Sequence, residues 1–270
     1  MIPLNLTEIS AIPPPRWSTN IVGFDKVLGG GIVKGSTMIV SGIPGAGKST
    51  LLLQLASKLA NQGKKIIYAS GEENDVQIKM RAERLGINSE NIILFPSTEV
   101  EKIIHAKFAY SPDLIIVDSL QMLSSTQLHS APGSPSQVRN GLLKINSMAK
   151  ENNVCVIFVG QSTKGGFIAG LQSYQHTVDT VLYLGIDENN NRFLEAKKNR
   201  FGQVGEVWQV VMTNEGLVDS YNQNSTTSSS DNYDIKLTQK QLDKILETHP
   251  LWNKIVRMSL YWLQKQQSKT

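Results

Sequence analysis

The stretch Gly42-Ile43-Pro44-Gly45-Ala46-Gly47-Lys48-Ser49 decides the fold, because it matches the phosphate-loop pattern GxxxxGK[ST] at every specified position. It follows the apolar run 38–41 and precedes the helical pattern 49–60, so strand, loop and helix agree. Glycines let such a loop curl around a phosphate, and the amino end of the helix adds a positive dipole. The alternative, an incidental glycine-rich turn, does not account for this context.

The loop predicts a site for ATP and Mg²⁺. Lys48 would reach the β and γ phosphates, and Ser49 would ligate Mg²⁺. The apolar run 114–117 ends in Asp118, a carboxylate that would lie beside the metal at the carboxyl edge of a parallel sheet. The residues assigned to the nucleotide and its metal are Gly42, Pro44, Gly45, Ala46, Gly47, Lys48, Ser49, Thr50 and Asp118, with Ser49 and Asp118 as the metal ligands.

ATP hydrolysis also needs a group that orients the attacking water. Glu72 and Glu73 follow the predicted strand 65–70, which we expect to lie next to the phosphate-loop strand. We assign Glu72 as the catalytic carboxylate. The alternative, two solvated carboxylates at the start of the next helix, applies to Glu73 in particular.

Strands and helices alternate along the chain, which predicts an α/β fold with a mostly parallel central sheet. The expected strands are 38–41, 65–70, 114–118, 154–161 and 180–184, and the expected helices are 49–60, 76–85, 100–109 and 137–150. Two later runs, 192–198 and 206–213, resemble antiparallel additions joined by a turn at 200–202.

Composition divides the chain into four parts. We expect an extended proline-containing segment over 1–20, the ATPase domain over 21–220, a Ser/Thr/Asn-rich linker over 221–235 and a basic helical hairpin over 236–270. The net charge is only +4, but the last part carries seven Lys and Arg against two acidic residues. The same part has an apolar stripe at helical spacing, Leu251, Ile255, Met258 and Trp262. The charge and the stripe predict contacts with DNA, with a recombination or replication protein, or with its own core.

Cys155 is the single cysteine, which excludes an internal disulfide framework and a cysteine-based zinc site. It also indicates a reducing compartment. No apolar run is long enough to span a membrane, and the first residues lack the pattern of a secretory signal. We therefore expect a cytoplasmic protein with no membrane partner.

Several further motifs accompany the phosphate loop. They are Leu28-Gly29-Gly30-Gly31-Ile32, Leu51-Leu52-Leu53-Gln54, Ser70-Gly71-Glu72-Glu73, Ser130-Ala131-Pro132-Gly133-Ser134, Val178-Asp179-Thr180-Val181-Leu182-Tyr183 and Lys198-Asn199-Arg200-Phe201-Gly202. Over about residues 17–219 the chain thereby resembles the ATPase core of the bacterial RadA (Sms) family, RecA-type motors of recombination related to hexameric helicases. The KNRFG element, 198–202, is highly specific to that family.

The resemblance implies a RecA-like P-loop fold and a ring, expected to be a hexamer, that hydrolyses ATP while acting on single-stranded DNA in the nucleoid. It places Lys198 and Arg200 at the subunit boundary as catalytic residues. There they would act as arginine fingers do and stabilise charge on the phosphoryl group of a neighbour's ATP. The alternative for them is a basic hairpin tip that faces solvent.

DNA would contact two loops, 124–136 and 162–176, through Lys164 and Arg139. For Lys164, a solvated charge is an equal alternative. Gln161 would sense the γ phosphate, at a position where the family usually has His.

Full members of the family carry a zinc module before this core and a Lon-protease-like domain after it, and we expect both to be missing here. Two other functions stay open. One is a KaiC-like ATP-dependent switch or assembly factor that acts on proteins without moving along DNA. The other is a replicative-helicase-type motor or loader of a mobile genetic element.

Overall fold

The structure is a computed structural model that describes residue 5, residue 7 and residues 13–162 and 174–220. The chain divides into two compact units, Met1–Ser225 and Thr226–Thr270, and every described residue belongs to the first unit. The predicted linker and helical hairpin therefore lie outside the described residues, as does Lys164. None of the helices in the described ranges is both long and apolar enough to cross a membrane.

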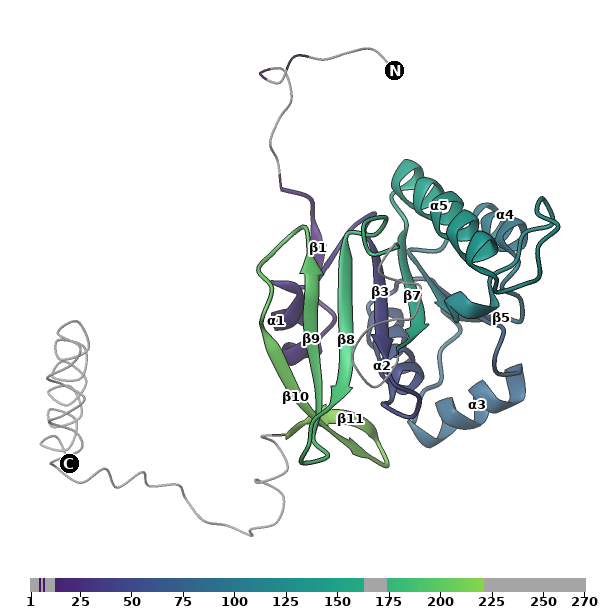
Figure 1. The fold of residues 1–270 in the computed structure, drawn as a ribbon. Helices are drawn as coiled ribbons and strands as arrows, with labels where there is room; N and C mark the ends of the chain where they lie inside the picture. The colour runs from purple at the N-terminus through teal and green to yellow at the C-terminus, as the bar shows by residue number, and fades with distance from the viewer. Residues whose placement is uncertain (1–4, 6, 8–12, 163–173, 221–270) are drawn as a thin grey trace, which may run out of the picture. The chain divides into compact units, whose positions relative to one another are not determined.

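A nine-stranded sheet forms the centre of this unit (Figure 1). Its strand order is β11-β10-β9-β8-β3-β7-β6-β4-β5. The six parallel strands are β3 (Thr37–Gly42), β4 (Ile66–Ser70), β5 (Ile92–Phe95), β6 (Leu114–Asp118), β7 (Cys155–Gln161) and β8 (Thr180–Ile186). The antiparallel strands are β9 (Arg192–Asn199), β10 (Val207–Thr213) and β11 (Gly216–Asp219).

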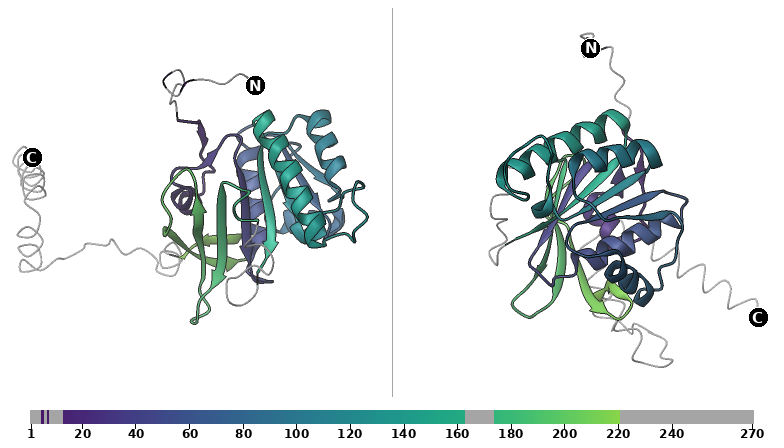
Figure 2. Two further views of the ribbon diagram at one scale, coloured as in Figure 1. Left: turned by 45° about the horizontal axis from the view of Figure 1, so that its top comes forward. Right: turned by 90° about the vertical axis from the view of Figure 1, so that its right-hand side faces the viewer.

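Helices cover both faces of the sheet (Figure 2). They are α1 (Val22–Leu28), α2 (Lys48–Ala60), α3 (Asp75–Arg84), α4 (Val100–Tyr110), α5 (Pro135–Asn152) and the short 3₁₀ helix η2 (Leu120–Met122). Strand side chains alternate between two hydrophobic cores: Met38 and Val40 pack with α1, α2 and α3, whereas Ile39 packs with α4 and α5. Strands buried on both faces explain the nearly continuous apolar runs in the sequence.

The predicted α/β RecA-like P-loop fold is therefore confirmed. One detail of the prediction is wrong: β4 does not lie next to the phosphate-loop strand β3, because β7 and β6 lie between them. Consecutive strands are neighbours in most sheets but not in all. Here the chain crosses over two strand positions through α2, and hydrophobic periodicity does not record the length of that crossing.

A short second sheet, absent from the prediction, joins the chain before α1 to the chain after it. In this sheet β1 (Arg16–Trp17) pairs with β2 (Ile32–Val33) in antiparallel orientation. Gly31 has a φ of +105°, and a Cβ there would lie 2.3 Å from the carbonyl oxygen of Trp17. Only glycine allows the two segments to come this close.

Candidate nucleotide-binding site

The phosphate loop leaves the carboxyl end of β3 and enters α2 at Lys48. Gly45 and Gly47 have φ angles of +76° and +109°, which side-chain-bearing residues rarely adopt. Gly42 needs a glycine for a different reason, because a Cβ there would lie 2.3 Å from the carbonyl oxygen of Leu184 on β8. Pro44 is exposed, whereas Ala46 and Thr50 are buried. The loop thus has the curled backbone that a phosphate cradle requires.

Lys48 folds back over its own loop. Its ammonium donates hydrogen bonds to the carbonyl oxygens of Gly42 (2.8 Å) and Ile43 (3.0 Å), and the residue is 8% exposed. Burial lowers the pKa of Lys48, and the negative charges of Asp118 and Glu72 offset part of this effect. The cation therefore lies within the field of the two carboxylates that the sequence assigns to the same site.

Asp118 ends β6 and is 3% exposed. Its Oδ2 accepts a hydrogen bond of 2.9 Å from Ser49 Oγ, so the two predicted metal ligands are in contact. Tyr68 Oη donates a second hydrogen bond of 2.9 Å to the same oxygen. Burial raises the pKa of Asp118, while the hydrogen bonds from Tyr68 and Ser49 act in the opposite direction.

This pair of ligands fits Mg²⁺ bound together with a nucleotide. Within the described ranges, no group of three or more His, Cys, Asp or Glu side chains forms a metal cage. Mg²⁺ in nucleotide sites is held by one or two protein oxygens plus phosphates and water, so such a cage is not needed. Ser49 and Asp118 would hold the ion at the amino end of α2.

Glu72 and Glu73 differ sharply in their surroundings. Glu72 Oε1 accepts hydrogen bonds from Ser119 Oγ (2.7 Å) and Gln161 Nε2 (3.0 Å), both at the carboxyl edge of the sheet. The Glu73 carboxylate instead accepts from the two terminal guanidinium nitrogens of Arg81 on α3. Glu72 reaches the phosphate-loop side although its strand is not a neighbour of β3.

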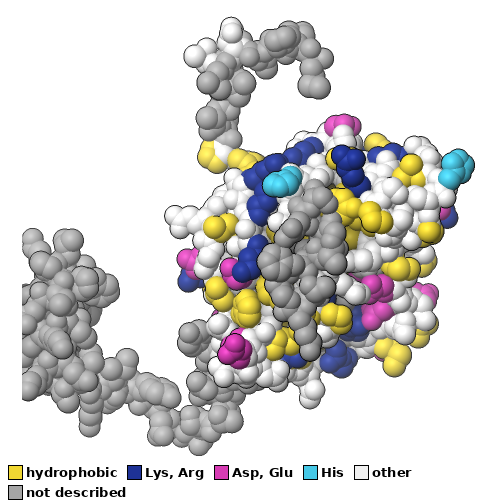
Figure 3. Space-filling model, in the orientation of Figure 1, with side chains coloured by type: hydrophobic (Ala, Val, Ile, Leu, Met, Phe, Trp, Pro, Cys, Tyr) yellow, Lys and Arg dark blue, Asp and Glu magenta, His cyan; other side chains and the backbone are white. Residues whose placement is uncertain are grey.

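The KNRFG element lies at the opposite edge of the sheet from the phosphate loop. Lys198 pairs with Val181 near the start of β8, and the backbone N–H of Arg200 donates to the carbonyl of Asp179 (3.0 Å). Asp179 bonds Thr37 at the start of β3, and the phosphate loop follows the other end of β3, about 16 Å away at roughly 3.3 Å per residue. Arg200 therefore cannot reach the phosphate loop of its own chain. Figure 3 shows Lys and Arg side chains gathered along the upper rim of one face.

The side chain of Asp179 links Arg200, Lys150 and the start of β3. Its Oδ1 accepts from Arg200 Nη1 (3.2 Å) and Lys150 Nζ (3.1 Å), and its Oδ2 accepts from the backbone N–H of Thr37 (3.0 Å). Lys198 Nζ donates to the carbonyls of Gln175 (2.6 Å) and Val178 (2.7 Å). Burial lowers the pKa of Lys198, and the nearby charge of Arg200 lowers it further.

Of the two loops assigned to DNA, only 124–136 is fully described. The sequence suggests a flexible loop, but the buried Gln137 side chain bonds the backbone of Ser125 and the carbonyls of Leu128 and Ser130. Glu101 also accepts from Ser125 Oγ (2.6 Å). Arg139 lies exposed near the start of α5. Residues 163–173, including Lys164, lie outside the described residues.

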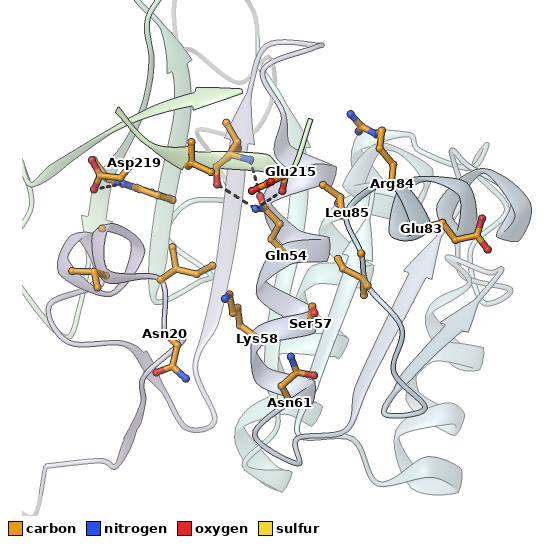
Figure 4. A pocket seen from close by; sticks show the side chains of 18 residues that line it. Asn20, Gln54, Ser57, Lys58, Asn61, Glu83, Arg84, Leu85, Glu215 and Asp219 are labelled. Atoms are coloured by element: carbon orange, nitrogen blue, oxygen red, sulfur yellow. Dashed lines mark hydrogen bonds between the residues drawn. The ribbon is translucent and has the colours of Figure 1, made fainter. Parts of the chain in front are cut away.

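A groove of about 900 Å³ lies alongside α2 (Figure 4). Its lining includes Gln54, Ser57, Lys58 and Asn61 of α2, and none of the predicted site residues. Gln54 binds strand β11 here, because its side chain accepts from the N–H of Leu217 (2.9 Å) and donates to the carbonyl of the same residue (3.2 Å).

The sequence reasoning missed four residues that shape the site: Tyr68, Arg81, Ser119 and Asp179. For Tyr68 there is a signal, since a hydroxyl in an otherwise apolar strand must find a partner when it is buried. Ser119 directly follows the assigned Asp118. For Arg81 and for the role of Asp179, no signal exists without the spatial arrangement, because their partners lie 8 and 21 residues away.

The parallel sheet, the phosphate loop and the carboxylate at the end of β6 together define a P-loop ATPase domain of the RecA type. A family model described as the KaiC ATPase matches residues 17–94. Homologues that are 42–46% identical over most of the chain are named DNA repair protein RadA, which is consistent with a RadA-like RecA-type core.

Two of these relatives illustrate the extent of the similarity. RadA of Aquifex aeolicus (strain VF5) is 46% identical over 203 residues, 75% of this chain and 46% of that protein. RadA of Bacillus subtilis (strain 168) is 42% identical over 221 residues, 82% of this chain and 48% of that protein. The chain thus spans about half the length of the curated relatives it matches.

A solved structure agrees with the fold. The crystal structure of a KaiC-like protein from Pyrococcus horikoshii OT3 superimposes with a TM-score of 0.65 at 21% sequence identity. The match covers 77% of this chain and 99% of that chain. At this identity the likeness concerns the fold alone.

Proposed function

We propose that this chain is an ATPase that assembles into a ring, a hexamer by the family resemblance, and acts on single-stranded DNA in recombination, repair or replication. The observation that carries the proposal is the cluster of Lys48, Ser49, Asp118 and Glu72 at one edge of the sheet. The similarity to proteins named DNA repair protein RadA supports the link to DNA.

The residues of the site divide the work of ATP hydrolysis. Lys48 exchanges its bonds to two loop carbonyls for bonds to phosphate oxygens, which stabilises the charge on the transferred group. Glu72 accepts the proton of the attacking water while the water oxygen bonds to the γ phosphorus and the bond from that phosphorus to the bridging oxygen breaks, which releases ADP and phosphate. Ser119 and Gln161 hold Glu72 in place. When bound, Mg²⁺ supplies positive charge to the phosphates.

A neighbouring chain would complete the site. Lys198 and Arg200 lie at the edge of the sheet opposite the phosphate loop, so in a head-to-tail ring they face the phosphate loop of the next copy. The planar guanidinium of Arg200 suits the charge that spreads over the equatorial phosphate oxygens. Gln161 contacts Glu72 and thereby links the proposed γ-phosphate sensor to the water-activating carboxylate.

The test measures ATP turnover by the full chain with and without single-stranded DNA. Alongside it, the mass of the assembly is measured with a non-hydrolysable ATP analogue. Turnover that DNA stimulates, together with a nucleotide-dependent ring, is the expected result. If there is no turnover under any condition, the proposal is wrong.

A KaiC-like switch is the second candidate, favoured by the family model that matches residues 17–94. In that case ATP would set the oligomeric state and the partner would be a protein. ATP turnover and assembly that are insensitive to DNA would support this candidate over the first.

A further inference from the structure

Tyr68 is a buried residue of β4 whose hydroxyl contacts Asp118 of the candidate nucleotide site. The residue is 1% exposed and packs in the core that β4 shares with α2 and α3. It pairs in register with Ile116 on β6, two residues before Asp118. From this position the hydroxyl donates a hydrogen bond of 2.9 Å to Asp118 Oδ2.

Asp118 Oδ2 accepts two hydrogen bonds, from Tyr68 and from Ser49. Over residues 13–162 and 174–220, both hydrogen bonds to the Asp118 carboxylate go to Oδ2 and none to Oδ1. If Ser49 turns toward a metal ion, as a P-loop serine does, Tyr68 stays as the donor that fixes the carboxylate. Its ring cannot follow a moving partner, because it is enclosed by close-packed side chains.

We propose that Tyr68 is a positioning residue that orients Asp118 toward the metal of a bound Mg-nucleotide. The inference rests on the proposed nucleotide site and assigns Tyr68 a role in it. A hydrogen bond to one carboxylate oxygen sets the rotation of the carboxylate, so the other oxygen would be available to the metal. Outer-shell partners of this kind commonly change metal affinity by about 10–100-fold.

The alternative is a purely structural role, in which Asp118 serves only as the hydrogen-bond acceptor that the buried Tyr68 hydroxyl needs. This alternative predicts a loss of stability when the hydroxyl is removed, but no selective effect on the metal. The two readings therefore differ in the Mg²⁺ dependence of nucleotide binding.

The experiment uses Tyr68→Phe in the full chain, which keeps the ring and removes the hydroxyl. Binding of a fluorescent ADP is titrated with Mg²⁺ and repeated in EDTA, and the melting temperature is measured without metal. We expect the half-saturating Mg²⁺ concentration to rise about tenfold, with metal-free ADP affinity unchanged within about twofold.

Tyr174→Phe is the matched control. Tyr174 is also buried, and its hydroxyl donates to the carbonyl of Pro135 (2.8 Å), far in sequence from the phosphate loop. It should lose stability without a change in the Mg²⁺ requirement. A Mg²⁺ requirement of Tyr68→Phe equal to that of the unmodified chain would overturn the inference, as would an equal shift in both variants.

A double mutant tests whether Tyr68 acts through Asp118. In an Asp118→Ala background, which removes the acceptor, Tyr68→Phe should cause no further change in the Mg²⁺ requirement, whereas independent effects would multiply. Failure of the proposed function would look different. In that case the unmodified chain itself would not bind ADP in a Mg²⁺-dependent manner.

Discussion

Gln161 Nε2 lies 3.0 Å from Glu72 Oε1, so the end of β7 is tied to the segment after β4 although β6 lies between the two strands. Ser119, which follows β6, donates to the same oxygen from 2.7 Å. One carboxylate oxygen thus collects donors from the ends of two strands. Such a fixed orientation is what a general base needs, because a small displacement from the reacting water costs much of the rate.

Glu72→Gln should lower ATP turnover by about 10²–10⁴-fold, because an amide cannot accept the proton of the attacking water. Nucleotide binding should persist, since the amide keeps the size of the side chain. Steady-state ATPase assays and fluorescent-nucleotide binding, run on the same preparation, measure the two effects.

Glu73→Gln is the matched control for this change. In the described structure the Glu73 carboxylate pairs with Arg81 and not with Ser119 or Gln161, so turnover should change by less than about threefold while stability falls modestly. If Glu73→Gln blocks hydrolysis and Glu72→Gln does not, the assignment of the base is reversed.

Lys48→Ala should abolish turnover and leave the domain folded. Among the described residues the ammonium bonds to carbonyls of its own loop alone, so its loss removes charge from the ligand site and few core contacts. We expect a loss of at least about 10²-fold in rate, with a melting temperature within a few degrees of the unmodified chain. Turnover near the original rate in the folded variant would exclude the assigned phosphate site.

The sequence predicts the central strands and helices of the fold closely. The run 114–118 coincides with β6, and helix 49–60 differs from α2 by one residue at its start. These elements are buried on both faces or strongly periodic, so local pattern and tertiary burial agree. The strand β5 was missed, because its four residues are only half-buried and lie at the edge of the sheet.

The site could be assigned from the sequence where a motif fixes backbone and chemistry together. Lys48, Ser49 and Asp118 were assigned in this way, and the structure brings Ser49 and Asp118 into contact. The order of the strands was not predictable from the sequence. The position from which Glu72 approaches the phosphate loop depends on that order, so it was not predictable either. Contacts such as that of Tyr68 with Asp118 join residues 50 positions apart, and only the register of β4 and β6 brings them together.

Asp179→Asn should destabilise the domain at neutral pH but much less in acid. Burial alone would raise the pKa of Asp179, but the N–H of Thr37 and the charges of Lys150 and Arg200 outweigh it and hold the pKa below its ordinary value. A depressed carboxyl pKa stabilises the fold above about pH 4, and this stabilisation is lost as the pH falls through the lower folded-state pKa.

We expect Asp179→Asn to lower the free energy of unfolding by about 1–3 kcal/mol at pH 7, with a smaller difference at pH 3. Urea unfolding at the two pH values measures it. The exposed Asp75 at the start of α3 provides a control, since Asp75→Asn should change stability by less than about 0.5 kcal/mol. An Asp179→Asn deficit of the same size at both pH values would contradict this account of the charge network.

Arg200 supplies the test of a shared site. In the described structure it lies at the edge of the sheet opposite its own phosphate loop and is held there by Asp179 and the carbonyl of His176. Arg200→Ala should therefore lower turnover by about 10³-fold or more without weakening Mg-nucleotide binding to the same chain. Specific activity of the unmodified chain should rise with protein concentration, because a single copy lacks the second half of the site.

Mixing two inactive variants separates action in trans from a structural defect. An Arg200→Ala chain keeps an intact phosphate loop, and a Lys48→Ala chain keeps an intact Arg200, so one type of mixed boundary contains both groups. The mixture should recover part of the activity that neither variant has alone. Arg200→Lys should stay impaired in the same assay, because an ammonium lacks the planar fork that contacts two oxygens at once. A folded Arg200→Ala chain that loses turnover yet shows no recovery in demonstrated mixed assemblies would place the effect of Arg200 within its own subunit, through the network of Asp179.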